Sequence, residues 1–203
     1  MKLMWFHFMP YPAFPDDFNK KHRSVWVDID PGLFDRDIMA TSYATYLEQL
    51  VYAEECGFDA ICVNEHHNNG YGLMPSPNLI ASVLANRTER AAIVVLGNSV
   101  ALYNPPVRVA EEMAMIDMFS KGRLIAGFPV GTSMDTCYSY GVNPSQLRPK
   151  YYEGIELILK AWTATEPFAF NGEFNKHRYV NAVPRPYQQP HPPVWIPGGG
   201  SIE

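Results

Sequence analysis

Five short apolar segments recur along the chain, and stretches with helical periodicity separate them. Apolar runs of this length between turn residues are typical of strands that are buried on both faces of a parallel sheet. Strands that alternate with helices restrict the chain to a parallel α/β fold, which is either a barrel or a doubly wound sheet. The predicted strands are residues 3–9, 59–64, 92–97, 123–128 and 193–197.

Apolar residues at helical spacing predict four helices between these strands. The first spans residues 42–56 and ends before Gly57, because glycine readily adopts the left-handed conformation found after helices. Proline favours the first helical turn, so Pro77, Pro106 and Pro149 are predicted to open the other three. The side chains expected to face inward are Tyr43, Tyr46, Leu47, Leu50 and Val51 in the first helix, Leu79, Ile80, Val83 and Leu84 in the second, and Tyr151, Ile155, Ile158, Leu159 and Trp162 in the fourth.

Two segments interrupt this alternation. Residues 10–41 are predicted to form a long loop, and a loop of that length in a compact domain is usually functional or a lid. Residues 166–192 contain Asn171-Gly172 between two apolar stretches, which predicts a two-residue type I′ hairpin turn. The residues expected either to line a substrate pocket or to pack in the core are Trp5, His7, Phe8 and the aromatic residues of 10–41.

The composition excludes several classes of protein. Of the 203 residues, 47% are hydrophobic and 18% are charged, so the chain can bury enough apolar surface to offset its ordering entropy. A net charge of −5 argues against nucleic acid and anionic membranes as partners. No apolar run reaches the length of about 18 residues that a membrane span requires. Cys56, Cys62 and Cys137 lack CxxC spacing, which favours reduced thiols and a cytoplasmic protein.

Polar or small residues follow four of the predicted strands at the point where each strand ends. In parallel α/β folds, ligands bind at the carboxyl ends of the strands. These residues therefore predict one ligand site that is shared by several loops. They are residues 64–69 (NEHHNN), 98–99 (NS), 129–133 (PVGTS) and 198–201 (GGGS).

Each motif at this site also has a structural interpretation. Glu65, His66 and His67 directly follow a buried strand, which favours a functional cluster over an ordinary loop. Their types are metal ligands, but adjacent side chains diverge and no second ligand cluster is evident, so no metal is expected. The glycines of 198–201 are as typical of a plain turn as of a phosphate cradle. Taken without further information, Arg148 is a solvated surface charge.

Several longer motifs occur in a fixed order along nearly the whole chain. They are VNEHH at 63–67, PSPNLIASVLANRT at 75–88, VVLGN at 94–98, PPVRVAEEMAMIDMFSKGRLIAGFPVG at 105–131 and PRPYQQPHPPVWIPGGGS at 184–201. In these motifs the chain resembles the bacterial-luciferase-like flavin-dependent monooxygenases, specifically members similar to alkanal monooxygenase. The resemblance implies a TIM-type (β/α)8 barrel, of which five strands are predicted here. We therefore expect residues 1–203 to form the N-terminal part of a single barrel domain, with its C-terminal strands missing.

The resemblance also implies roles for individual residues. His66 matches the catalytic histidine that supports proton transfer, and Glu65 matches a carboxylate beside the flavin. Gly97 and Asn98 match a position where relatives place an unusual peptide bond under the flavin ring, sometimes a non-proline cis bond. The residues that match phosphate-binding positions are Arg148, Gly199, Gly200 and Ser201.

The activity implied by the resemblance is oxygenation of a small organic substrate, for instance an aldehyde, by O2. Reduced FMN, supplied by a separate flavin reductase, would react with O2 to form a flavin C4a-peroxide. Bacterial luciferase has a reactive cysteine and an arginine where this chain has Pro129 and Val130, so FMN and the deazaflavin F420 both stay open. The alternatives are a coenzyme F420-dependent dehydrogenase, a non-catalytic flavin-binding protein and, more distantly, a metal-dependent hydrolase. The resemblance further implies a homodimer through residues 77–88 and 106–119.

Overall fold

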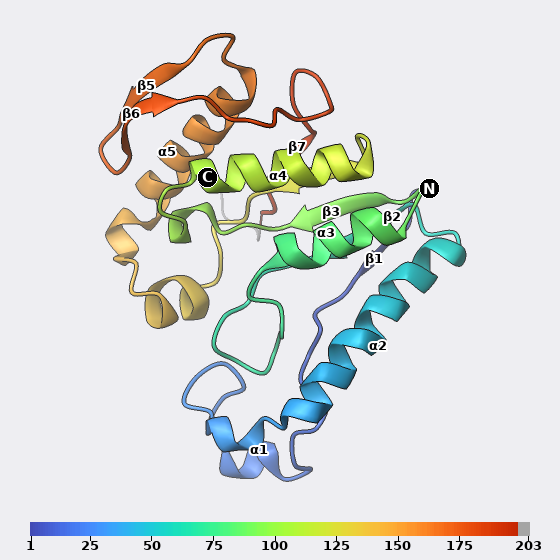
Figure 1. The fold of residues 1–203 in the computed structure, drawn as a ribbon. Helices are drawn as coiled ribbons and strands as arrows, with labels where there is room; N and C mark the ends of the chain where they lie inside the picture. Colours follow the sequence, from blue (N-terminus) through green and yellow to red (C-terminus); the bar gives the residue numbers. More distant parts are fainter. Residues whose placement is uncertain (199–203) are drawn as a thin grey trace.

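The computed structural model describes residues 1–198, and its centre is a five-stranded parallel sheet (Figure 1). The strands pair in the order β1-β2-β3-β4-β7, so their order in space repeats their order along the chain. A doubly wound sheet would reverse its order at a switch point, whereas a barrel adds each strand on the same side. All five predicted strands are confirmed, as β1 Met4–Phe6, β2 Ala60–Val63, β3 Ala92–Leu96, β4 Leu124–Gly127 and β7 Val194–Trp195.

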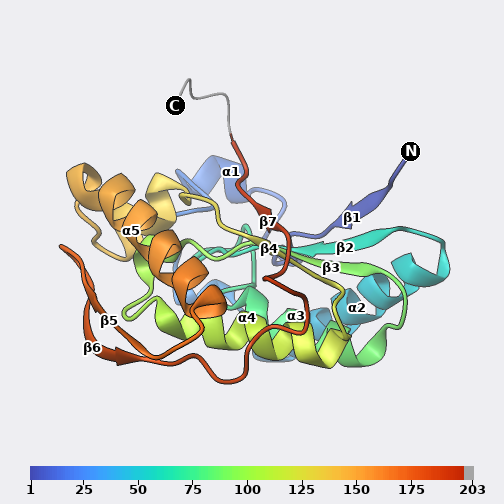
Figure 2. The same cartoon turned by 90° about the horizontal axis from the view of Figure 1, so that it is seen from above.

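Helices connect successive strands and lie outside the sheet. Seen from above, α2, α3 and α4 all lie on the same side of it (Figure 2), as they do around a barrel. No helix of residues 1–198 is long and apolar enough to cross a membrane. The helices are α1 Phe18–Lys21, α2 Arg36–Glu55, α3 Pro77–Arg87, α4 Val107–Ser120 and α5 Pro144–Thr163, with short turns η1 Pro31–Leu33, η2 Val100–Leu102 and the π-helical η3 Met134–Ser139.

The two faces of the sheet differ in what covers them. Alternate strand residues such as Ile61, Ile93 and Leu124 are buried in the main core beneath the helices. The opposite face carries a smaller apolar cluster built around Ala60, Cys62 and Val94. The main core therefore lies between the sheet and the helices, and the opposite face carries the smaller of the two clusters.

Two helices begin earlier than predicted. α2 begins at Arg36 because the Asp35 side chain accepts hydrogen bonds from the backbone N–H groups of Asp37 and Ile38, so its first turn lies inside the expected loop 10–41. That segment also contains α1 and η1 and is not one continuous loop. α5 begins at Pro144, with Asn143 as its cap, and Pro149 lies within the helix. A proline does open this helix, but it is Pro144 and not the predicted Pro149.

The inward face of α3 was predicted in part incorrectly. Leu84 is buried and Ile80 packs against the core, but Leu79 and Val83 are 70% and 38% exposed. The small residues Ala81 and Ala85 occupy the buried side instead, together with Asn78. The Asn78 amide donates a hydrogen bond to Glu112 on the neighbouring α4, so close packing between α3 and α4 favours small side chains there. The expected inward residues of α2 and α5 all belong to the core or pack against it.

The hairpin after α5 has a longer turn than predicted. β5 Phe168–Asn171 pairs with β6 Lys176–Val180, and the pairing of Asn171 with Lys176 leaves a four-residue turn. The Glu153 carboxylate on α5 accepts hydrogen bonds from the backbone N–H groups of Glu173, Phe174 and Asn175. Burial acts to raise the pKa of Glu153, but these donors and the Asn175 amide more than offset it, so the pKa is lowered. A tertiary carboxylate therefore determines the turn in place of a local Asn-Gly preference.

We expect Glu153→Gln to lower the free energy of unfolding by about 1–3 kcal/mol, because a charged acceptor for several N–H groups is lost. Chemical denaturation at pH 7 measures the difference. Glu156→Gln, an exposed change on the same helix, is the control and should alter stability by less than about 0.5 kcal/mol. Equal effects of the two substitutions would contradict this account of the turn.

Candidate functional site

A pocket of about 580 Å³ lies at the carboxyl ends of the strands. The segments that follow β2, β3, β4 and β7 all contribute to its walls, as the sequence predicted for a shared site. Of the expected site residues, Glu65, His66, Gly97 and Arg148 line the pocket. Asn98 is fully buried beside it, and Gly199, Gly200 and Ser201 lie outside the described residues.

His66 is held by a carboxylate that the sequence analysis missed. Its Nδ1 lies 2.9 Å from Oδ2 of Asp135, which is supplied by η3 after β4. Asp135 is 2% exposed and also accepts hydrogen bonds from the His67 backbone N–H and from the Thr132 hydroxyl. In the sequence, Asp135 is a single carboxylate just beyond the predicted site loop 129–133, and the spacing Thr132-x-x-Asp135 was the signal that could have indicated it.

The negative charge of Asp135 determines which ring nitrogen of His66 carries the proton. Burial acts to raise the pKa of Asp135, but hydrogen bonds from His66, His67 and Thr132 more than offset that effect, so the pKa is lowered. An ionised carboxylate can only accept hydrogen bonds, so Nδ1 of His66 carries the proton. In a neutral imidazole this leaves Nε2 as the proton acceptor.

Aromatic side chains surround the His66 ring. The rings of Trp26 and Tyr71 meet it edge-on, with centroids 5.1 and 5.2 Å away. Phe8 lies nearly parallel to it at 6.2 Å. Of the aromatic residues expected either to line a substrate pocket or to pack in the core, Phe8 and Trp26 lie beside the His66 ring. These rings limit the access of water to the imidazole.

The neighbouring histidine belongs to a separate network. Nε2 of His67 lies 2.8 Å from Oε1 of Glu65, and Oε2 of Glu65 accepts a 2.7 Å hydrogen bond from the Tyr103 hydroxyl. Burial first, and the nearby Glu65 charge second, raise the pKa of Tyr103, so its phenol keeps its proton. Oε2 also faces the backbone N–H of Ser99. Glu65 thus connects the loop after β2 to the segment after β3, and both of its oxygens are occupied by protein groups.

The floor of the pocket is made by close contact between two strands. A Cβ atom added to Gly97 would collide with the carbonyl oxygen of Gly127 on β4, so only glycine fits there. The structure has a non-proline cis peptide bond between Leu96 and Gly97, one bond before the Gly97-Asn98 position expected. Gly97 therefore presents bare backbone to the pocket, and a planar ring can approach it closely.

The residues present fit a flavin phosphate. The pocket has apolar surface at Leu96 and Gly97, the hydroxyls of Ser99 and Ser133 along its walls, and the cation Arg148. The side-chain oxygen of Asn64, which also lines the pocket, is buried without a partner within residues 1–198 and can accept a hydrogen bond from a heterocyclic N–H. A volume of this size is within the usual range for cofactor pockets.

No group of three His, Cys, Asp or Glu side chains within the described part of the chain is placed to hold a metal ion. His66 and His67 turn their bonded ring nitrogens toward different carboxylates, Asp135 and Glu65. Their arrangement serves two hydrogen-bond networks.

Comparisons with known proteins agree with this geometry. The family model described as luciferase-like monooxygenase matches residues 29–203, so the chain belongs to the luciferase-like monooxygenase family. It is 33% identical over 173 residues to the uncharacterized protein y4wF of Sinorhizobium fredii, covering 81% of this chain and 49% of that one. It is 30% identical over 169 residues to the oxygenase component of the flavin-dependent trigonelline monooxygenase of Acinetobacter baylyi, covering 80% and 45%. The alkanal monooxygenase alpha chain of Photorhabdus luminescens is 29% identical over 147 residues, covering 71% and 39%.

Solved structures show the same fold. The monooxygenase RslO1 of Streptomyces bottropensis superposes with a TM-score of 0.77 at 24% identity, over 97% of this chain and 53% of that chain. The oxygenating constituent of 3,6-diketocamphane monooxygenase from Pseudomonas putida, solved with FMN, gives 0.73 at 17% identity, over 97% and 51%. An F420-dependent secondary alcohol dehydrogenase gives 0.66 at 21% identity, over 76% and 48%. The chain spans about half the length of these relatives. The predicted fold class, that of the luciferase-like TIM barrels, is confirmed.

We expect the contribution of Asp135 to stability to depend on pH. Its pKa in the folded protein is below the value of about 3.9 in unfolded chains, so the stabilisation is present above that pH and is lost as pH falls through the lowered folded pKa. Asp135→Asn should therefore reduce the free energy of unfolding by about 2–3 kcal/mol near pH 7. The difference from the wild type should shrink below about pH 4.

Denaturant titrations between pH 3 and pH 7 measure this difference. Asp16→Asn, an exposed change, is the control and should show no such pH dependence. A difference for Asp135→Asn that stays constant over the whole range would contradict the assigned charge state.

Proposed function

We propose that this chain belongs to the oxygenase component of a two-component flavin-dependent monooxygenase that oxidises a small organic substrate. The observation that carries the proposal is His66 on the pocket wall, with Nδ1 bonded to a buried Asp135. A histidine with one nitrogen fixed and the other available can transfer a proton at neutral pH. Pure binding of a flavin would not require that arrangement, which disfavours a non-catalytic flavin-binding protein.

Reduced FMN, when bound in the pocket, supplies the electrons that activate O2. Arg148 and the hydroxyls of Ser99 and Ser133 are the described groups suited to a phosphate dianion, and Gly199, Gly200 and Ser201 stay candidates for the same role. Leu96, Gly97 and Val130 offer apolar surface to the ring and exclude water. Glu65 acts through His67, Ser99 and Tyr103 by holding two loops of the pocket in register.

A separate flavin reductase is the proposed source of reduced flavin, in agreement with the related protein that is described as an oxygenase component. Coenzyme F420 is the alternative cofactor, since an F420-dependent enzyme shares the fold. Spectral titration of the purified protein with FMN and with F420 separates the two proposals, because only the true cofactor should bind at micromolar concentration.

We expect His66→Ala to lower the rate of substrate oxidation by about 10²–10⁴-fold, because general acid–base catalysis contributes that much. FMN affinity should change little. The measurements are product formation from a panel of small aldehydes and ketones with photoreduced FMN and O2, and flavin titration for affinity.

His191→Ala is the control, since His191 precedes β7 and lies at the opposite end of that strand from the pocket. Near-ultraviolet absorbance after mixing reduced flavin with O2 reports whether the protein retains an oxygenated flavin. Oxidation that survives His66→Ala would contradict the proposed role.

We further propose that two copies of the chain associate through α3 and α4. These helices pack side by side, and their outer faces expose Leu79, Val83, Met115, Met118 and Phe119. Exposed apolar side chains gathered on neighbouring helices indicate an interaction surface. The pairing of α3 and α4 with a second copy is also what the resemblance implied.

The double substitution Leu79→Lys with Phe119→Lys should weaken dimerisation by at least about 100-fold, since it places charges in the buried centre of the contact. Sedimentation velocity over a concentration series measures the dissociation constant. Tyr52→Lys, an exposed aromatic residue on α2, is the control. A wild-type protein that stays monomeric at high micromolar concentration would overturn the dimer.

A further inference from the structure

His66 belongs to two pockets. The second pocket, of about 570 Å³, is formed by residues 29–43 and the loop 66–75. His66 is the one residue that lines both this pocket and the proposed flavin pocket within the described chain. A molecule in the second pocket would therefore lie next to the imidazole on which the proposed chemistry depends.

More than half of the residues that line the second pocket are apolar. Of its uncharged polar residues, Tyr43 and Asn69 are already engaged, because the Tyr43 hydroxyl donates to the Leu73 carbonyl and the Asn69 oxygen accepts from the N–H groups of Tyr71 and Gly72. The third, Asn68, is exposed to solvent. Tyr43 and Asn69 hold the pocket in shape and offer few hydrogen bonds to a ligand. The apolar lining residues are Ile29, Pro31, Phe34, Met39, Leu73 and Pro75.

One cation stands among these apolar residues. Arg36, the first residue of α2, lines the pocket and forms no ion pair with the described acidic residues. No Asp or Glu lines this pocket. An apolar cavity with a lone guanidinium recognises an apolar molecule that carries an anion, and the planar guanidinium matches a carboxylate especially well.

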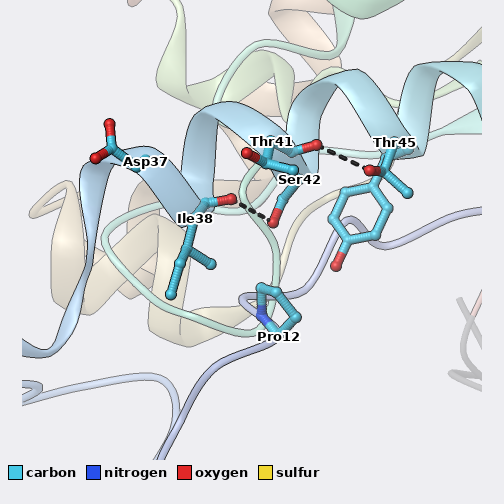
Figure 3. A pocket seen from close by; sticks show the side chains of 7 residues that line it. Pro12, Asp37, Ile38, Thr41, Ser42 and Thr45 are labelled. Carbon is cyan, nitrogen blue, oxygen red and sulfur yellow. Dashed lines mark hydrogen bonds between the residues drawn. The ribbon is translucent and has the colours of Figure 1, made fainter.

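The opposite side of α2 provides an internal comparison. A hollow there is lined by Pro12, Asp37, Ile38, Thr41, Ser42, Thr45 and Tyr46 (Figure 3). At 3.6 residues per turn Asp37, Thr41 and Thr45 face nearly away from Arg36, Met39 and Tyr43. The hydroxyls of Ser42 and Thr45 donate back to carbonyls of the helix, and the charged group is the acid Asp37. This hollow does not include His66, so α2 directs only its Arg36 face toward the site.

We propose that the organic substrate occupies the second pocket and is an apolar monocarboxylate, with its carboxylate on Arg36 and its reacting carbon toward His66. This substrate class rests on the proposed monooxygenase function. The carboxylate forms a charge-assisted hydrogen bond to the guanidinium, and the apolar body replaces water against Phe34, Met39 and Leu73.

The test compares matched carboxylates and amides on the FMN-loaded protein. Cyclohexanecarboxylate and 4-phenylbutyrate should bind at least about tenfold more tightly than their amides, because only the acids carry a charge for Arg36. Arg36→Gln should remove that preference, and Arg36→Lys should retain part of it. The exposed Arg23→Gln is the control and should leave the preference intact. Calorimetry measures affinity, and the NMR signal of the Met39 methyl group should shift on binding.

Equal affinities for acid and amide, a preference that survives Arg36→Gln, or an unmoved Met39 signal would overturn the assignment of the pocket. The outcome is separable from that of the proposed function. Carboxylates that bind through Arg36 without being oxidised would support the pocket and count against the monooxygenase. Oxidation of neutral substrates at a rate that Arg36→Gln leaves unchanged would support the monooxygenase and count against the assignment of the pocket.

Discussion

The buried carboxylate of Asp135 is the interaction on which the site depends. It accepts hydrogen bonds from the His66 ring, the His67 backbone, the Asn69 amide and the Thr132 hydroxyl, so it joins the loop after β2 to the loop after β4. A charge that is removed from water requires several donors, and here the donors come from the loops after β2 and β4, two strands that are separated in the sheet by β3. The same contacts that stabilise the charge therefore position the imidazole.

The strand alternation was predictable because it depends on local pattern. All five strands and the position of Glu65 and His66 at one end of the sheet follow from where apolar runs stop, whereas Gly97 and Arg148 were assigned to the site only through the family resemblance. Asp135 was missed because its role depends on a contact over 69 positions in the sequence, which no local spacing reveals. The family resemblance added the histidine's role but gave no indication of its carboxylate partner.

Two of the incorrect predictions have a shared physical origin. Leu79 and Val83 were placed inward by periodicity, yet close packing between α3 and α4 selects Ala81 and Ala85 for the buried side. The Asn171-Gly172 turn was assigned from local preference, yet the Glu153 carboxylate on α5 organises a longer turn. In each case a tertiary contact overrides a local tendency of comparable size, and such contacts become visible only once the elements are assembled.

Two adjacent histidines have different hydrogen-bond partners because of the geometry of a chain that leaves a strand. Successive side chains there point in opposite directions, so His66 reaches Asp135 while His67 reaches Glu65. The network of Asp135 includes the His66 ring, which is open to two pockets. The network of Glu65 and His67 is buried and connects the loops after β2 and β3. The buried network of His67 limits how far the loop can move. His66 beside it can therefore remain accessible without losing its orientation. A single mobile histidine would lose orientation as it gained access, and the paired arrangement avoids that conflict.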